Sequence, residues 1–199
     1  MRLEDAFLFL SVDLSGPWRA DPAAVCAKAI RVGADVIEVR PAAADPDRSA
    51  AEVRRIAEVC RRDDALLFVG DDPSLAARAG ADGAHLDRSP LTISEARTIL
   101  DTGGPVGRTA RTPEEASLAL ELGADYLVYE GGCACPGVFA GFRGLTAAPL
   151  FAAGLADIEE ARAVVQRGVY RLCLAATGSP AETVADRVAG FSRLLGRSV

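Results

Sequence analysis

The sequence predicts an α/β protein, a single (β/α)8 TIM barrel in which residues 1–199 form one domain. First, the tripeptide Gly-Ala-Asp recurs about every 45 residues, each time between a helical pattern and a short apolar run. Second, further apolar runs alternate with amphipathic segments between these copies, which is typical of parallel strands joined by helices. Third, eight such strand–helix units in about 200 residues suit a small closed barrel, and no linker or low-complexity segment divides them.

Eight short apolar runs are the expected strands. Four of them follow Gly33, Gly80, Gly123 and Gly168, where glycine suits the end of the preceding helix because φ is often positive there. The other four lie between these positions. In chain order the expected strands are residues 7–12, 36–39, 66–69, 83–86, 105–109, 126–129, 149–153 and 171–174.

Four of the connecting helices have a recognisable start. Each begins with a capping residue followed by proline, which suits the first helical position because no helical hydrogen bond is lost there. These pairs are Asp21-Pro22, Asp72-Pro73, Thr112-Pro113 and Ser179-Pro180. An open doubly wound sheet is the alternative architecture. No Gly-x-Gly-x-x-Gly follows the first strand, which disfavours it.

Charge and hydropathy limit the possible partners. The formal net charge is −6, which disfavours nucleic acid because phosphate binding needs a basic face. The longest apolar run near the N-terminus, residues 6–10, is far shorter than the roughly 20 residues of a membrane span. Glu4 and Asp5 precede it where a secretory signal would be basic. We therefore expect a cytoplasmic protein with no membrane or nucleic-acid partner, and reduced, buried cysteines.

Few side chains are available for proton or covalent chemistry, since the chain has one lysine and one histidine. Lys28 is predicted to face water from its helix, which disfavours a Schiff-base aldolase. His85 is the one imidazole that can act as general acid or base, and its alternative role is that of a hydrogen-bonded structural residue. Cys133 and Cys135 lack the additional ligands that a zinc site needs.

The carboxyl ends of the strands form the expected catalytic face. Small residues after the last two strands let backbone N–H groups approach a phosphate, helped by the start of the next helix. Gly154 and the run Ala176-Thr177-Gly178 are therefore candidate phosphate-binding residues. The alternative is that these residues only make tight turns.

Two charged residues on this face are candidates for binding a phosphorylated ligand with a metal. Arg40 ends the second strand and suits bidentate phosphate binding; the alternative is an ion pair with Glu38 or Asp71. Asp71 follows the third strand and can ligate Mg2+. Its alternative role is to favour the positive end of the following helix.

A set of short sequence motifs in a fixed order gives the most specific indication of the protein family. These are Gly80-Ala-Asp-Gly-Ala-His-Leu86, Ser94-Glu-Ala-Arg97, Gly107-Arg-Thr109, Thr112-Pro-Glu-Glu-Ala116 and Gly123-Ala-Asp-Tyr126. Over nearly its whole length the chain resembles the thiamine phosphate synthase and thiazole tautomerase superfamily. In the synthase, Mg2+ helps pyrophosphate leave an aminopyrimidine, and the nitrogen of a thiazole phosphate captures the resulting cation.

The resemblance implies roles for individual residues. Arg40 matches the arginine that holds pyrophosphate, Asp71 matches one metal-binding aspartate, Thr109 stands at a serine, and Gly154 stands at the second glycine of a phosphate loop. With His85 as the available acid or base, the predicted catalytic set is Arg40, Asp71, Thr109 and His85. The implied partner is a small phosphorylated ligand with Mg2+, and a homodimer is consistent with the family.

Several positions depart from the family pattern. They are Glu38 for a glutamine, Ala42 for a lysine, Gly70 for an asparagine, Pro90 for the second metal aspartate, Ala153 for the first phosphate-loop glycine and Ala176 for a serine. The Thr-x-Thr-Lys loop after the sixth strand is absent from residues 130–136. Asp87 is the predicted replacement for the missing metal carboxylate, and Glu38 is placed among the ligand-binding residues.

These departures leave three further functions open. One is a divergent barrel that has lost synthase activity and binds a small ligand or a protein. Another is a thiazole tautomerase-like isomerase, although the histidine of that branch corresponds to Gly131 or Gly132 here. The third is a sugar-phosphate isomerase with Glu130 or Asp13 as its base.

Overall fold

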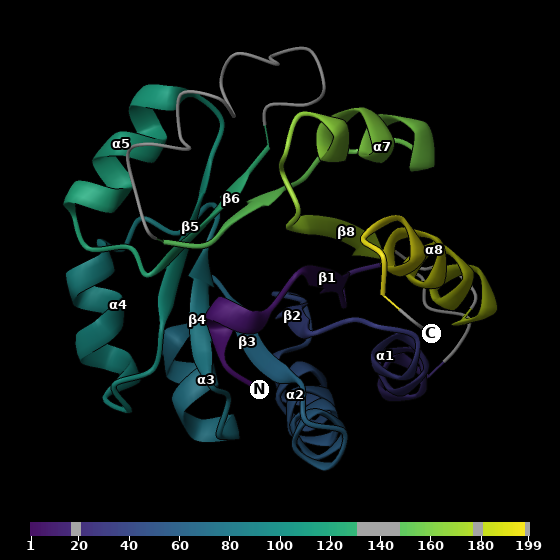
Figure 1. Cartoon of the computed structure of the whole chain (residues 1–199). Coiled ribbons are helices and arrows are strands. Elements are labelled where there is room, and N and C mark those ends of the chain that lie inside the picture. The colour runs from purple at the N-terminus through teal and green to yellow at the C-terminus, as the bar shows by residue number, and fades with distance from the viewer. Residues whose placement is uncertain (17–20, 131–147, 177–180, 198–199) are drawn as a thin grey trace.

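The computed structural model describes residues 1–16, 21–130, 148–176 and 181–197. It confirms the predicted barrel, because eight parallel strands pair in chain order and β1 pairs with both β2 and β8 (Figure 1). The strands are β1 Leu8–Asp13, β2 Val36–Arg40, β3 Leu66–Gly70, β4 Gly83–Leu86, β5 Val106–Ala110, β6 Tyr126–Tyr129, β7 Leu150–Ala152 and β8 Leu172–Ala176.

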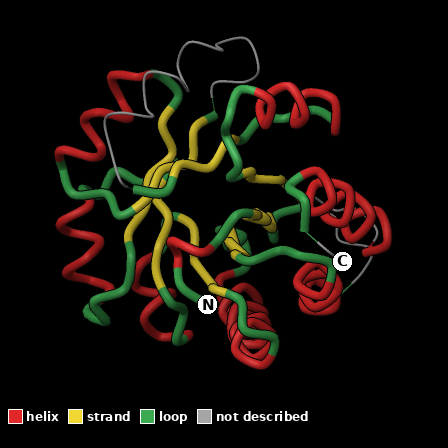
Figure 2. Tube along the Cα trace, viewed as in Figure 1, coloured by secondary structure: helices red, strands yellow, loops and turns green. Residues whose placement is uncertain are grey.

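Helices surround the ring of strands, as Figure 2 shows. They are the 3-10 helix η1 Leu3–Asp5, followed by α1 Pro22–Arg31, α2 Pro46–Arg62, α3 Pro73–Ala79, α4 Ile93–Leu100, α5 Pro113–Glu121, α7 Ile158–Gln166 and α8 Ala181–Leu194. Three predicted starts are confirmed, since Asp21, Asp72 and Thr112 each cap a helix whose first residue is proline. Ser179 and Pro180 lie outside the described residues. No helix in the described part of the chain is long and apolar enough to cross a membrane.

The Gly-Ala-Asp repeat connects strands in pairs at the amino end of the barrel. Each aspartate precedes an even-numbered strand, and its carboxylate accepts hydrogen bonds from the backbone at the start of the strand before it. The donors are Phe7 and Leu8 to Asp35, Leu67 to Asp82, and Val106 to Asp125, at 2.7–3.0 Å. Tyr170 replaces the fourth aspartate, and β7 and β8 share a single paired position.

Aromatic side chains fill the barrel interior. Phe9, Phe68, Tyr126 and Phe151 are fully buried and contact one another, with ring centroids 5.1–6.3 Å apart. Gly107 is required beside them because a Cβ there would lie 2.2 Å from Tyr126 Cζ. The aromatic layer therefore fixes the Tyr126 ring, which in turn contacts the site described below.

The described cysteines fit the expected reduced state. Cys26, Cys60 and Cys173 are buried free thiols, and burial raises the pKa of each. A raised pKa keeps the thiol protonated and chemically inert at neutral pH. Cys133 and Cys135 lie outside the described residues.

Candidate functional site

A cavity of about 140 Å³ opens at the carboxyl ends of the strands. It brings together five of the predicted site residues, Glu38, Arg40, His85, Thr109 and Gly154. It is completed by Ser11, Val128, Glu130, Ala153, Leu155, Cys173, Ala175 and Arg187. Strand register explains part of this set, because Ser11 of β1 lies beside Glu38 of β2 and Ala175 of β8.

Glu38 is a buried carboxylate at this cavity. Its exposed fraction is 3%, and its Oε1 atom has no hydrogen-bond partner in the described residues. The nearest cation is Arg40, whose Nε lies 3.6 Å from that oxygen, so the predicted alternative ion pair of Arg40 with Glu38 is present. A Cβ on Gly70 would lie 2.9 Å from the same oxygen. A side chain at position 70 would therefore clash with Glu38, so the two departures from the family pattern, at positions 38 and 70, are sterically compatible with each other.

Asp87 is held between two arginines at the end of β4. Arg40 Nη2 lies 2.5 Å from Asp87 Oδ2, and Arg111 Nη2 lies 2.6 Å from Asp87 Oδ1. Arg111 Nη2 also lies 2.7 Å from Glu130 Oε2. Burial raises the pKa of Asp87, but the hydrogen bond from Arg111 and the charges of both arginines outweigh it and lower the pKa below its usual value. Asp87 is thus an ionised carboxylate whose negative charge is balanced by two arginines.

Asp71 holds the loop after β4 in place. Its carboxylate accepts hydrogen bonds of 2.8–3.2 Å from the backbone N–H groups of Asp87, Arg88 and Ser89. Its own N–H donates to the His85 carbonyl, and its φ of 56° lies in the left-handed region. The sequence carries no signal for this role, because Asp71 and the loop are far apart along the chain.

The two predicted metal ligands do not form a prepared Mg2+ site. The oxygens of Asp71 accept backbone N–H groups, and those of Asp87 are paired with arginines. Among the described residues, no group of three His, Cys, Asp or Glu side chains converges to hold a metal ion. A hard cation needs such free oxygen ligands, so this arrangement does not fit Mg2+, and the roles of Asp71 and Asp87 as its ligands stay predictions.

His85 is buried behind Thr109. Its Nε2 lies 2.8 Å from Thr109 Oγ1 and its Nδ1 lies 3.2 Å from Tyr126 Oη. Burial is the largest influence on its pKa and lowers it, so the imidazole is neutral at pH 7. Both ring nitrogens have hydrogen-bond partners, which favours the structural role, and the geometry lets His85 orient the Thr109 hydroxyl toward the cavity. Its role as acid or base stays a prediction.

The opposite side of the cavity is formed by residues after β7 and on β8. Gly154 has a φ of 73° and lines the cavity together with Ala175. Ala176 is buried and is absent from the cavity lining, so the predicted contact falls on its neighbour instead. Thr177 and Gly178 lie outside the described residues. Arg187 also lines this side, and sequence reasoning missed it because it lies on α8 rather than at a strand end.

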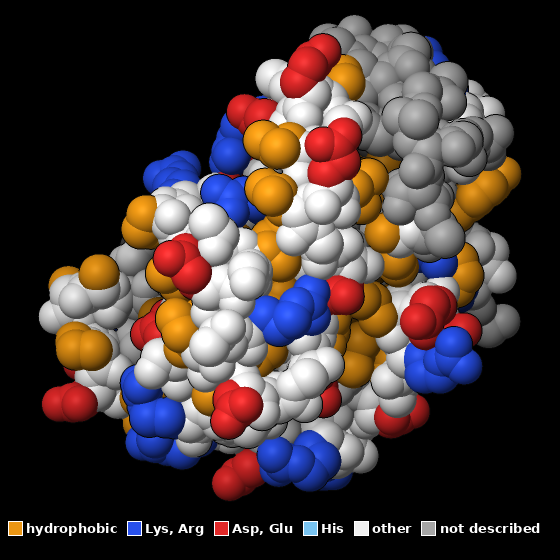
Figure 3. Space-filling view, turned by 90° about the vertical axis from the view of Figure 1, so that its left-hand side faces the viewer, with side chains coloured by type: hydrophobic (Ala, Val, Ile, Leu, Met, Phe, Trp, Pro, Cys, Tyr) orange, Lys and Arg blue, Asp and Glu red, His pale blue; other side chains and the backbone are white. Residues whose placement is uncertain are grey.

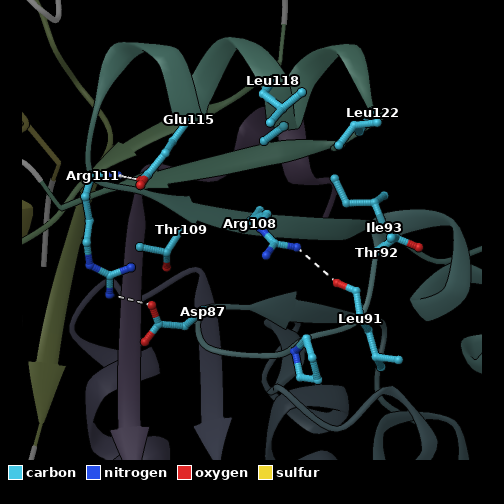
Figure 4. Close-up of a pocket in the computed structure, with 12 residues that line it drawn as sticks. Asp87, Leu91, Thr92, Ile93, Arg108, Thr109, Arg111, Glu115, Leu118 and Leu122 are labelled. Carbon is cyan, nitrogen blue, oxygen red and sulfur yellow. Dashed lines mark hydrogen bonds and ion pairs between the residues drawn. The ribbon is translucent and has the colours of Figure 1, made fainter.

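A second pocket of about 350 Å³ shares Thr109 with the cavity and lies between the start of α4 and the length of α5. In Figure 4, Arg111 reaches toward Asp87, and Arg108 donates a 3.1 Å hydrogen bond to the Leu91 carbonyl. The space-filling view of Figure 3 shows the adjoining outer face, where basic and acidic side chains are intermixed.

The fold and site define a class: a (β/α)8 barrel with a charged cavity at the carboxyl ends of its strands, where such barrels bind their ligands. A sequence model of the family described as thiamine monophosphate synthase matches residues 12–131. The chain therefore belongs to the thiamine monophosphate synthase family, as its sequence motifs predicted.

Individual relatives agree with this assignment. The chain is similar to a thiamine-phosphate synthase of Anaeromyxobacter dehalogenans, with 44% identity over 55% of this chain and 49% of the relative. A thiamine-phosphate synthase of Salinispora arenicola is 32% identical over 88% of this chain and 91% of the relative. The structure of a thiamine phosphate pyrophosphorylase from Pyrococcus furiosus shares the fold, with a TM-score of 0.85, 22% identity and 98% of both chains covered. Several of the matches span only about half of the curated relative or less.

Proposed function

We propose that the chain is a thiamine phosphate synthase-like transferase that joins hydroxymethylpyrimidine pyrophosphate to thiazole phosphate. The observation that carries this proposal is the convergence of Arg40, Thr109 and Gly154 on one cavity in a barrel of this family. In this reaction the bond from the pyrimidine methylene to pyrophosphate breaks, the pyrophosphate leaves with the electron pair, and the thiazole nitrogen bonds to the methylene carbon.

The described residues supply three functions for that reaction. Arg40 lies at the cavity edge, where its guanidinium can exchange Asp87 for a pyrophosphate oxygen. Thr109, oriented by His85, offers a hydroxyl to the ligand. Gly154 has no side chain to cover the backbone, so a phosphate of the ligand can approach the backbone N–H groups after β7. Mg2+, a homodimer and a cytoplasmic location stay predictions from the sequence.

The experiment that tests the proposal measures thiamine phosphate formed by the purified chain from both substrates, with and without Mg2+. We expect product from the wild type and a loss of about 100-fold or more in kcat/KM for Arg40→Gln, because a charge-assisted phosphate contact is removed. Arg54→Gln, on the exposed face of α2, is the matched control and should be unchanged. Absence of product from the wild type with Mg2+ would contradict the proposal.

A second candidate function is a divergent barrel that binds a small ligand without synthase activity. It is favoured by the neutralisation of Arg40 and Arg111 by Asp87, Glu38 and Glu130. The double variant Ala42→Lys, Pro90→Asp tests it, because both changes restore residues of the family pattern. This candidate predicts no product from the wild type or the double variant and no binding of pyrophosphate by either; product from the wild type would eliminate it.

A further inference from the structure

Arg187 is a cation at the side of the cavity formed by β7 and β8. It lies in the second turn of α8 and lines the cavity with Gly154, Leu155 and Ala175. Within the described residues its one hydrogen bond runs from Nη1 to the Ala175 carbonyl, at 3.3 Å. A guanidinium has five N–H donors, so most of the hydrogen-bonding capacity of Arg187 remains free for a ligand.

The pairing of the arginines sets Arg187 apart. Arg40 and Arg111 are each within 4 Å of two carboxylates. Arg187 forms no ion pair with any residue in the part of the chain that the structure describes. It is also more exposed than Arg40. An incoming anion therefore displaces no carboxylate at Arg187, whereas it competes with Asp87 at Arg40.

The surroundings of Arg187 leave room for an anion. Ala175 is the one exposed residue of β8, whose other four residues are buried, so the strand is uncovered at this point. Gly154 offers no side chain, and its positive φ is a conformation in which glycine is favoured. An unpaired arginine fork beside bare backbone suits a tetrahedral dianion, which takes two parallel N–H donors and approaches the backbone closely.

We propose that Arg187 binds the phosphate monoester group of the small ligand, and so is a specificity-determining residue contributed by α8. The identity of that ligand as thiazole phosphate rests on the proposed function, whereas the recognition of a phosphate by Arg187 does not. Arg187 lies beyond residues 12–131, the part matched by the family model. It lies on the side of the barrel formed by β7 and β8, where Ala153 and Ala176 stand in place of the glycine and serine that the family resemblance implies. The arginine supplies donors on the side of the cavity where these replacements lie.

The test uses the full chain and two ligands. Binding of inorganic phosphate is measured by titration calorimetry at low ionic strength, and KM is measured for thiazole phosphate and for the thiazole alcohol. For Arg187→Gln we expect phosphate affinity to fall about 10- to 100-fold, as loss of a charged hydrogen-bonding partner predicts. The KM for thiazole phosphate should rise similarly, while that for the alcohol stays the same. Arg187→Lys should recover part of the affinity because it keeps the charge without the fork.

Arg193→Gln is the matched control, since Arg193 is an exposed arginine on the same helix that does not line the cavity. Unchanged phosphate affinity in Arg187→Gln, equal losses in Arg187→Gln and Arg193→Gln, or no phosphate binding by the wild type would each overturn the proposal. If the wild type forms no thiamine phosphate while Arg187→Gln alone loses phosphate binding, the proposed function fails and the role of Arg187 stands. If the wild type is active and Arg187→Gln leaves both measurements unchanged, the proposed function stands and the role of Arg187 fails.

Discussion

At the scale of single residues, Glu38 is one of two described side chains, with Ser192, that have a buried polar atom without a hydrogen bond. Its Oε1 atom is buried without a hydrogen bond and lies 3.6 Å from Arg40 Nε. A buried carboxylate oxygen without a donor is costly, and its charge opposes the binding of an anion at the neighbouring guanidinium. The glutamine that the family resemblance implies at this position would bring no charge. We therefore expect Glu38 to weaken the binding of anions in the cavity.

The first prediction concerns Glu38→Gln. Removing this buried negative charge should strengthen the binding of inorganic pyrophosphate by about 3- to 10-fold, because Arg40 then loses one of its two carboxylate neighbours. Titration calorimetry measures the affinity, with Glu58→Gln on the exposed side of α2 as control. Weaker binding in Glu38→Gln would show that the carboxylate supports the anion site instead of opposing it.

The second prediction concerns the pH dependence of stability due to His85. Its pKa is lowered in the folded chain from an ordinary value of 6.5 by burial, so the unfolded chain binds a proton that the native chain does not. The free energy of unfolding should therefore fall as pH drops below about 6.5. Urea unfolding at a series of pH values measures it.

The comparison that isolates this effect is His85→Gln, which can hydrogen-bond Thr109 and Tyr126 without titrating. Asp87, with its lowered pKa, contributes only near and below its ordinary pKa of 3.8, outside this window. Wild type and variant should differ in slope between about pH 7 and pH 5. Parallel curves over that range would show that the imidazole takes up its proton equally in both states.

At the scale of elements, the ends of β3 and β4 are connected through Asp71. The aspartate closes β3 and captures three consecutive N–H groups after β4, which sets where Asp87 meets Arg40 and Arg111. This link explains how a site made of residues from separate strands keeps its geometry. Asp71 thereby acts as a positioning residue in this structure.

The third prediction compares two variants of Asp71. Asp71→Ala should lower the free energy of unfolding by about 2 kcal/mol, because three backbone N–H groups at the surface lose their carboxylate acceptor and alanine is disfavoured at positive φ. Asp71→Asn keeps an oxygen acceptor and tolerates that φ, so its loss should be about 1 kcal/mol. Urea unfolding monitored by circular dichroism gives both values. Equal losses in the two variants would contradict the positioning role.

At the scale of the whole molecule, closure of the barrel depends on contacts between distant segments. Asp35 is 2% exposed, and its carboxylate accepts a hydrogen bond from the Leu8 N–H of β1. Both Nη atoms of Arg197 also donate to this carboxylate, at 2.6 and 2.7 Å. These contacts join the aspartate of the first Gly-Ala-Asp copy to the segment after α8. The start of β1 and the end of the described chain are thus fixed to each other next to the β1–β8 pairing.

The fourth prediction is that Arg197→Met destabilises the folded chain by about 2–3 kcal/mol, because it leaves the buried Asp35 without its cation. This loss of stability is smaller than for a fully buried ion pair, because Arg197 is about one-third exposed to solvent. Arg193→Met on the exposed side of α8 is the control. A loss no larger than that of the control would show that the backbone donors alone satisfy Asp35.

Much of the fold was predictable because its signals are local. A glycine after a helix, a proline after a capping residue and an apolar run each report on a few neighbouring residues, and their repetition indicated the barrel. The cavity was predictable in part for the same reason, since strand ends of a closed parallel barrel meet at one mouth. Arg40 and Gly154 were predicted in this way, whereas Thr109 was predicted from the family resemblance and His85 as the one imidazole of the chain.

The sequence by itself determined the barrel, the family and the residue types at the strand ends. Only the tertiary structure decided how those residues are paired: Asp87 with two arginines, Asp71 with backbone N–H groups, and Arg187 with no carboxylate among the described residues. The reason is that ion pairing and desolvation depend on distances between atoms far apart in the chain, whereas hydrophobic periodicity and capping depend on neighbours along it.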